Sequence, residues 1–535
     1  MAVLVVMSRP NFSFSYDPAT GLLAFQSPQG LLHLACQAHA AQPHDPDAGL
    51  AWSLLEQTEN AEGVLWRFAA QQTVWTKKTL CVHIRQNDVL FWLELEGDAP
   101  IDTLTFFAGI PADKLNEPQS TLSHLSWARR NFARDWSGSP FSCAAVFNPQ
   151  PDAFGEQQLP ATVSQRITCA TTFGPQVFNT FFAPPLYAYV LDDHFCLGLA
   201  APIGQSRFTH FDYVATHGWG LQLHYDAMTR VAGSFKSPIL RLAPCSQVEG
   251  GLADYVNYLR SSGLAPAPAS APDWAYRPMF CGWGQQTVWN NQAQAGAVTD
   301  PGTPIIPGTG SYGNQAAYER MLDLLTQFQI PFGNLTIDMG WSPVTALPIP
   351  DSEGWTDLRG FIERLHKQGK KVLLWLGCWH TRGLDDKFKM VHDPGLADWC
   401  DPTNPEFMQR LGDHIQHAIS PRGGGLNADG FKLDFTGDVP RGSGYRPCAN
   451  LWGLDLVHHY VKFIHDAMKS AKADTVLETH CANPQFADLT EMLRLNDIFS
   501  NRTDINTRMA FRSCMARIAN PCCPIDTDND PFISH

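Results

Sequence analysis

The chain has 535 residues, of which 44% are hydrophobic and 17% are charged. This composition excludes a disordered or coiled-coil chain, and the length allows two or three domains with a sizeable core. The 38 Lys and Arg residues against 52 Asp and Glu residues give a net charge of −14. Because an acidic surface repels phosphate backbones and anionic lipids, we expect neither a nucleic acid nor a membrane as partner.

The first ten residues contain a short apolar run without a basic segment before it, so we expect no export signal and no membrane span. The 14 cysteines are scattered and include no Cys-x-x-Cys pair. This spacing predicts free thiols in a reducing cytoplasm, with no metal site and no cofactor. The sequence leaves the oligomeric state open, a homo-oligomer included.

Residues 1–250 have the pattern of an all-β domain. Short runs of alternating apolar and polar residues are broken by turn residues, as in 11–16 before Asp17 and Pro18. The runs 80–84 and 89–95, separated by Gln86, Asn87 and Asp88, predict a hairpin. We expect a large β-sandwich whose core contains most of the tryptophans, among them Trp66, Trp75, Trp92 and Trp136.

Residues 251–274 are predicted to connect two domains. A helical pattern at 252–262 is followed by the Pro/Ala-rich stretch 265–272, whose composition is typical of a stiff linker. Beyond it, apolar strands alternate with amphipathic helices, which predicts a parallel (β/α)8 barrel over 275–535. The expected strands are 278–283, 334–340, 371–378, 428–434, 475–480, 497–504 and 522–526, and the expected helices are 316–327, 358–368, 405–418, 453–470 and 508–519.

The predicted barrel has seven strands, of which the last is the weakest prediction. Because a complete barrel leaves no open edge, we expect this barrel to be truncated near its last strand. Two long insertions, 285–314 and 341–355, follow the first and second strands on the face where a substrate would enter.

The stretch 428–437 holds the main candidate for chemistry. Read as a strand, it directs Lys432 and Asp434 to one face, with Leu433 on the other. Asp434 then lies at the carboxyl end of the strand, where barrels of this kind carry catalytic groups. A nearby lysine favours an ionised carboxylate, as a nucleophile requires. The alternative interpretation is a surface ion pair at the end of a strand.

A second carboxylate, Asp504, follows 70 residues later, at the end of the expected sixth strand. Side chains two strands apart can converge across a barrel mouth. Two carboxyls about 5–5.5 Å apart, one a nucleophile and one an acid/base, are what a retaining glycosidase needs. If the sixth strand lies elsewhere, the substitute candidates for the acid/base are Asp497, Asp526 and Asp528.

At this point the sequence resembles the clan of retaining α-glycosidases that comprises families 27, 31 and 36. Family 36, the α-galactosidase and raffinose-synthase group, is the most similar. Five segments carry the resemblance in the order of the family: Thr336-Ile-Asp-Met-Gly-Trp341, Asp401-Pro-Thr-Asn-Pro-Glu406, Gly430-Phe-Lys-Leu-Asp434, Glu478-Thr-His-Cys481 with Phe486-Ala-Asp-Leu489, and Asn501-Arg-Thr-Asp-Ile-Asn506.

The resemblance implies an N-terminal β-supersandwich before the barrel and a role for each matched residue. Asp434 would be the nucleophile and Asp504 the acid/base. Substrate contacts would come from Asp338, Lys432, Cys481 and Arg502, with Trp283 and Trp375 as pocket walls. Arg502 would also lower the pKa of its neighbour Asp504, which conflicts with the need of an acid to keep its proton.

Two positions depart from the pattern of the family. Met339 stands where the family has a second aspartate, which puts a galactose preference in doubt, and Gln485 stands near a frequent arginine. The expected function is a retaining α-glycoside hydrolase, similar to the α-galactosidases, that acts on a small carbohydrate. The alternatives are a transglycosidase of the raffinose-synthase type and an inactive sugar-binding remnant. The sequence identifies neither the sugar nor its linkage.

Overall fold

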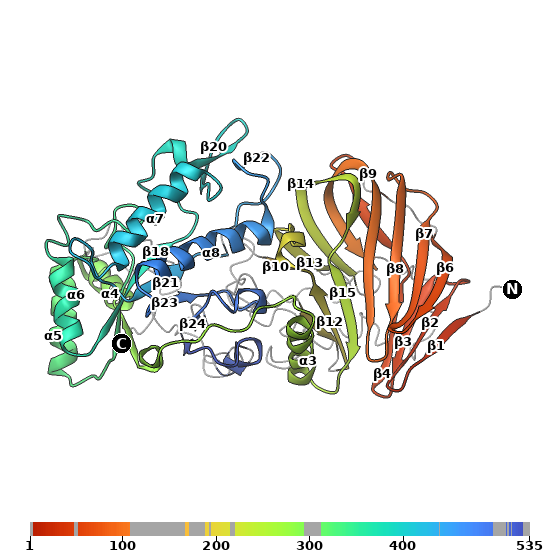
Figure 1. Cartoon of the computed structure of the whole chain (residues 1–535), viewed down its shortest axis with the longest axis horizontal. Helices are drawn as coiled ribbons and strands as arrows, with labels where there is room; N and C mark the ends of the chain where they lie inside the picture. The colour runs from red at the N-terminus through yellow and green to blue at the C-terminus, as the bar shows by residue number, and fades with distance from the viewer. Residues whose placement is uncertain are drawn as a thin grey trace.

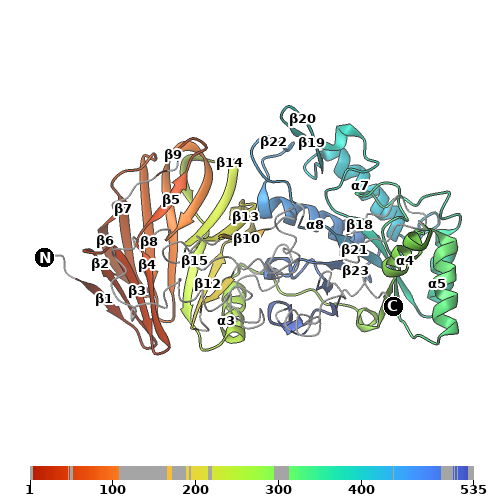
Figure 2. The same ribbon diagram turned by 180° about the vertical axis from the view of Figure 1, so that it is seen from behind.

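The structure is a computed structural model, and it describes residues 4–45, 47, 52–107, 166–170, 188–191, 194–214, 220–293, 312–437, 439–495, 510, 513–514 and 516–527. A β-rich part formed by the first half of the chain lies beside an α/β part formed by the second half (Figure 1). Figure 2 shows the same two parts from behind.

The β-rich part contains two antiparallel sheets, as the alternating runs predict. A four-stranded sheet has the order β1-β2-β3-β4, and an eleven-stranded sheet is built around β9, which pairs with β5, β8, β14 and β15. The strands are β1 Val5–Ser8, β2 Ser13–Asp17, β3 Leu22–Ser27, β4 Gly30–Ala35, β5 Ala38–Ala41, β6 Trp52–Asn60, β7 Gly63–Ala70, β8 Lys77–Ile84, β9 Val89–Phe106, β10 Arg166–Ala170, β11 Ala188–Leu191, β12 Phe195–Ala200, β13 His210–Val214, β14 Gly220–Lys236 and β15 Ile239–Pro244.

The two sheets share one core. Alternate residues of β2 and β3 are buried, and Phe14 of β2 packs against Trp66 of β7 and Phe91 of β9, with ring centroids 5.7 and 6.0 Å apart. Trp75 and Trp92 are also buried, as predicted, whereas Trp136 lies outside the described residues. The predicted hairpin is the β8–β9 pair, in which Ile84 faces Val89. The described residues of the first part are therefore β-rich, as expected.

The α/β part is organised around seven strands that form one sheet in the order β16-β17-β18-β21-β23-β24-β25. Each neighbouring pair is parallel, and the sheet curves into a nearly closed barrel (Figure 1). The strands are β16 Met279–Cys281, β17 Asn334–Ile337, β18 Lys371–Gly377, β21 Gly430–Asp434, β23 Val476–Thr479, β24 Met492–Arg494 and β25 Ile525–Asp526.

The sixth strand of this sheet is β24, which was not among the predicted strands. The strand predicted at 497–504, with Asp504 at its end, lies outside the described residues. The other six predicted strands are confirmed within a few residues, including the weakly predicted β25.

Helices cover the outside of the barrel, as a parallel sheet requires. These helices are α4 Trp283–Ala293, α5 Gln315–Gln327, α6 Leu358–Lys367, α7 Pro405–Ile419 and α8 Gly453–Ala471. The helix expected at 252–262 is α3 Val248–Ser261, which packs against β11 and β12 of the β-rich part. α4 was not predicted, because we read 285–314 as an irregular insertion. In the predicted helix 508–519, the described residues 510, 513–514 and 516–519 are helical. A small sheet of β19 Lys389–His392, β20 Gly395–Cys400 and β22 Tyr445–Arg446 projects beside α7 (Figure 1).

The two parts of the chain are joined by buried polar contacts. The amide nitrogen of Asp455, in the first turn of α8, donates to the carbonyl of Ser206, and its carboxylate lies 3.3 Å from Arg207. Gln485 is buried and donates to the carbonyls of Ala201 and Leu264. The residue that departs from the resemblance at 485 is therefore a structural link between the barrel and the preceding part.

Two features of the described residues bear on the sequence analysis. All the cysteines described with their side chains are free, as expected from their spacing. Within the described helices, none has the length and apolar character needed to cross a bilayer.

Candidate active site

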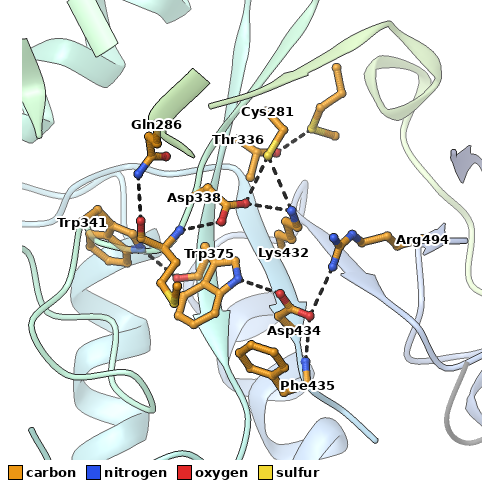
Figure 3. Close-up of polar contacts among 12 residues, drawn as sticks. Cys281, Gln286, Thr336, Asp338, Trp341, Trp375, Lys432, Asp434, Phe435 and Arg494 are labelled. Atoms are coloured by element: carbon orange, nitrogen blue, oxygen red, sulfur yellow. Dashed lines mark hydrogen bonds and ion pairs between the residues drawn. The ribbon is translucent and has the colours of Figure 1, made fainter. Parts of the chain in front are cut away.

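The site lies at the carboxyl ends of β17, β18, β21 and β24. Parallel register places Trp375 of β18, Lys432 of β21 and Glu478 of β23 side by side, and Gly377 beside Asp434. Because residues in register share a face, these side chains point into the barrel. Figure 3 shows Asp338, Lys432, Trp375 and Asp434 converging there, with Arg494 reaching in from β24.

Asp434 is held by donors on both of its oxygens. The indole Nε1 of Trp375 donates to Oδ2 at 3.0 Å, and Nη1 of Arg494 donates to Oδ1 at 3.2 Å. The amide of Phe435 also donates to Oδ1, at 2.9 Å. These contacts fix the direction of the carboxylate at the barrel mouth (Figure 3).

The charges around Asp434 keep it ionised. Burial acts to raise its pKa, but Arg494, then His480 and then Lys432 outweigh burial and hold the pKa of Asp434 well below its usual range. The expectation that Lys432 favours an ionised Asp434 is confirmed in direction, although Arg494 and His480 contribute more. Arg494 contributes most because it bonds the carboxylate directly, whereas Lys432 is directed elsewhere.

Lys432 forms a buried ion pair with Asp338. Its Nζ lies 2.8 Å from Oδ2 of Asp338, and both side chains are almost fully buried. Cys281, at the end of β16, donates to the same oxygen at 3.1 Å and lies 3.5 Å from Nζ. The lysine, the aspartate and the thiol therefore join the first, second and fourth strands (Figure 3).

A second set of contacts fixes Asp338 and the chain that follows it. The amide of Asp338 donates to the hydroxyl of Tyr318 at 2.7 Å, and that hydroxyl donates to Gln286 of α4. Gln286 in turn donates to the carbonyl of Met339 at 3.0 Å. Oδ1 of Asp338 accepts from the amide of Met339 at 2.7 Å. The loop that carries Met339 is thus fixed by hydrogen bonds to Gln286, Tyr318 and the side chain of Asp338.

Backbone strain follows Asp434 directly. Phe435 has a φ of 59°, a left-handed conformation that is uncommon for a bulky residue. The ring of Phe435 meets Trp375 edge-on at 5.9 Å, and Trp341 supports the same wall by donating from Nε1 to the carbonyl of Trp375. The turn that ends β21 is therefore built around the carboxylate and its tryptophan partner.

The structure brings together four of the predicted site residues: Asp338, Trp375, Lys432 and Asp434. Trp283 begins α4 and is half-buried. Cys481 is fully buried, where its amide donates to Thr479, and burial raises the pKa of its thiol to about 12. Its role as a substrate contact stays a prediction.

The predicted acid/base Asp504 and its neighbour Arg502 lie outside the described residues, as do Asp497 and Asp528. Of the substitute carboxylates, Asp526 is described, and it lies at the end of β25 in register with Arg494. The distance from Asp434 to the proposed partner Asp504 therefore stays a prediction.

Sequence reasoning missed four polar residues of the site: Cys281, Gln286, His480 and Arg494. Nε2 of His480 accepts from Nη1 of Arg494 at 2.9 Å, and Nδ1 of His480 lies 4.0 Å from Asp434. His480 lies within 478–481, one of the segments that carry the resemblance, so it could have been proposed as a site residue. Arg494 could not, because its strand has only three residues and no alternation to mark it.

One segment of the resemblance has a structural role. Asn404 caps α7, since its side chain accepts from the amides of Glu406 and Phe407. Asp401 accepts from the amide of Thr403 and from that of Cys448. The Asp-Pro-Thr-Asn-Pro-Glu stretch therefore starts a helix.

A cavity of about 390 Å³ lies at the opposite end of the barrel, where Lys371 begins β18. Its lining mixes both signs of charge, including Arg277, Lys370, Lys371 and Asp474. Among the described residues, no group of three or more His, Cys, Asp or Glu side chains is arranged to hold a metal ion.

Comparison with known proteins shows which solved structures share this fold. No family model and no curated protein sequence matches the chain. Among solved structures, an α-N-acetylgalactosaminidase from Bifidobacterium bifidum is similar over 98% of this chain and 84% of its own, with a TM-score of 0.57 and 11% identity. The chain has the fold of the α-glycosidases. A second similar structure is a family GH31 sulfoquinovosidase from E. rectale. The similarity covers 99% of this chain and 74% of the sulfoquinovosidase, with a TM-score of 0.54 and 12% identity.

Proposed function

We propose that this chain is a retaining α-glycoside hydrolase in which Asp434 is the nucleophile. The observation that carries the proposal is an ionised carboxylate, fixed by Trp375 and Arg494, at the carboxyl end of the fourth barrel strand. Carboxylates at that end of a barrel are placed to meet substrate. The α-glycosidase fold of the chain supports the same reading.

In the proposed reaction, an oxygen of Asp434 attacks the anomeric carbon of an α-linked sugar. A covalent β-glycosyl-enzyme forms as the bond to the leaving group breaks, and water then hydrolyses it. Ionisation of Asp434 is a requirement of the first step, because only the carboxylate has the electron pair to donate. Arg494 and Trp375 supply this state without taking up every lone pair of the carboxylate.

The proposed acid/base is Asp504, which would protonate the leaving oxygen and later deprotonate the attacking water. This assignment rests on the resemblance of 501–506 to the acid/base segment of family 36. It requires Asp504 to approach Asp434 to about 5–5.5 Å. Arg502 and Cys481 are proposed substrate contacts on the same ground.

The proposed substrate is an α-galactoside or a close relative. Solved structures with this fold include an enzyme named for α-linked N-acetylgalactosamine and one named for sulfoquinovose, so the fold accommodates several sugars. Both oxygens of Asp338 already accept hydrogen bonds inside the protein. Because Met339 adds no second carboxylate, we expect weaker hydroxyl recognition here than the α-galactosidase pattern provides.

Replacement of the nucleophile tests the proposal. Asp434→Ala should abolish hydrolysis of an aryl α-galactoside, and added azide should restore turnover and give the β-glycosyl azide. A matched control is Asp429→Ala, a buried aspartate on the same strand segment that pairs with His366 and Lys472 away from the mouth. Full activity in folded Asp434→Ala protein would contradict the assignment.

Two alternatives share the same site. A transglycosidase of the raffinose-synthase type would transfer the sugar to an added acceptor, and product analysis with and without that acceptor separates it from a hydrolase. The methionine at 339 favours the second alternative, an inactive sugar-binding remnant, which calorimetry would reveal as binding without hydrolysis. We also propose a cytoplasmic location, which the free cysteines support.

A further inference from the structure

Glu478 is a buried carboxyl beside the proposed nucleophile that the reaction above does not use. It lies on β23 in register with Lys432, and its exposed fraction is 0%. Neither of its oxygens has a hydrogen-bond partner of ordinary geometry among the described residues. Burying an ionised carboxylate without hydrogen-bond donors costs folding free energy, so the protonation state of Glu478 needs an explanation.

The two cations nearest to Glu478 are committed to other carboxylates. Nζ of Lys432 lies 2.8 Å from Asp338, and Nη1 of Arg494 lies 3.2 Å from Asp434. Neither cation forms an ion pair with Glu478, although both are close enough to influence it. An ionised Glu478 would compete for both cations, so their observed positions favour a neutral Glu478.

The count of charges leads to the same conclusion. Lys432 and Arg494, with His480 as a further positive influence on Asp434, lie among the carboxyls of Asp338, Asp434, Glu478 and Asp526. Asp526 approaches from the end of β25, next to Arg494 in register. Asp338 and Asp434 each accept from a cation, whereas neither oxygen of Glu478 has a donor of ordinary geometry. Of these three carboxyls, Glu478 is therefore the one that most easily accepts a proton.

We infer that Glu478 is a positioning residue held in its neutral, protonated form, and that its neutrality leaves Lys432 to Asp338 and Arg494 to Asp434. Burial and the neighbouring Asp526 raise the pKa of Glu478 well above its usual range, against the opposing influence of Lys432 and Arg494. Glu478 thereby sets the charge around the nucleophile without touching it. This inference rests on the proposed function only for its catalytic consequence.

Glu491 provides a matched control within the same region. It is also buried, but it accepts from the amide of Leu477 at 2.9 Å and pairs with His465 and Lys469 at 3.1 and 2.7 Å. These partners lower its pKa despite burial. The two buried glutamates therefore differ in their neighbours, since Glu491 accepts from two cationic side chains and an amide, whereas Glu478 has a second carboxyl, Asp526, beside it.

Infrared difference spectroscopy of the resting protein tests the protonation state without any substrate. At neutral pH, E478Q should remove a carbonyl band of a protonated carboxylic acid, whereas E491Q should remove only carboxylate bands. Loss of carboxylate bands alone in E478Q would overturn the inference. Because no turnover is measured, this result is independent of whether the chain is a glycosidase.

Stability and activity test the positioning role. Glu478 binds a proton more tightly in the folded than in the unfolded protein, so wild type should lose stability relative to E478Q as pH rises above the ordinary pKa of a glutamate. Parallel pH profiles of the two proteins would overturn the inference. In an active enzyme, the neutral isostere E478Q should keep kcat/KM within about threefold, and a loss greater than roughly a hundredfold in folded protein would show that neutrality alone is not its role.

Discussion

Nη1 of Arg494 lies 3.2 Å from Oδ1 of Asp434 and 2.9 Å from Nε2 of His480. This guanidinium therefore ties the fourth strand of the barrel to the sixth strand and to the loop after the fifth. It is also the strongest of the charges that keep Asp434 ionised. An arginine is suited to this position because it stays charged and offers several donors in a fixed geometry.

Arg494→Met should raise the pKa of Asp434. Loss of an opposite charge at this distance shifts a carboxyl by about 1–3 pH units, so the acidic limb of the kcat/KM profile should move upward. The control is Arg230→Met, which removes an exposed ion pair with Asp98 in the β-rich part. An unchanged acidic limb in folded Arg494→Met protein would contradict this role.

Lys432→Met should destabilise the protein strongly, because it leaves Asp338 buried without its cation. Breaking one side of a buried ion pair costs about 3–5 kcal/mol, which urea unfolding would measure. The comparison is Lys77→Met, whose exposed pair with Glu96 should contribute less than about 1 kcal/mol. Similar losses in the two variants would show that the buried pair has no special importance.

Asn404→Ala should lower stability and spare catalysis. The side chain caps α7, and loss of such a cap costs about 0.5–2 kcal/mol. Activity per folded molecule should match wild type, since the side chain of Asn404 contacts the amides of α7 and the carbonyl of Lys387. A selective fall in kcat at full folding would instead give the Asp-Pro-Thr-Asn-Pro-Glu stretch a role in the reaction.

Asp455 should make stability fall as pH rises. Burial raises its pKa to about 7, against the opposing influence of Arg207. Since the folded protein binds this proton more tightly than the unfolded chain, stability declines between about pH 4 and pH 7, with a slope of at most about 1.4 kcal/mol per pH unit. Asp455→Asn should flatten the profile in this window, and an unchanged slope in denaturant titrations at several pH values would contradict the assignment.

Much of the barrel could be predicted because its longer strands are continuous apolar runs between amphipathic helices. Lys371–Gly377 and Gly430–Asp434 are buried along almost their whole length, which gives them a clear sequence pattern. Met492–Arg494 was not predicted, because three residues are too few to show such a pattern. The strand predicted at 497–504 lies outside the described residues.

The pairing of charges could not be predicted from spacing. Lys432 and Asp434 are two residues apart on one face, so sequence reasoning joined them, yet each side chain finds its closest partner on another strand. Cys281 and Arg494 are separated from the aspartates that they contact by more than fifty positions. Only the register of the sheet brings them together.

The first turn of α8 packs against the β-rich part at Gly453. The φ of 59° at this glycine and its close approach to the carbonyl of Phe208 leave no room for a side chain. The amide of Leu454 donates to that same carbonyl. An excised barrel would therefore present unsatisfied backbone donors and bare apolar surface where its neighbour had been. Anyone seeking a minimal catalytic fragment should keep both halves of the polypeptide.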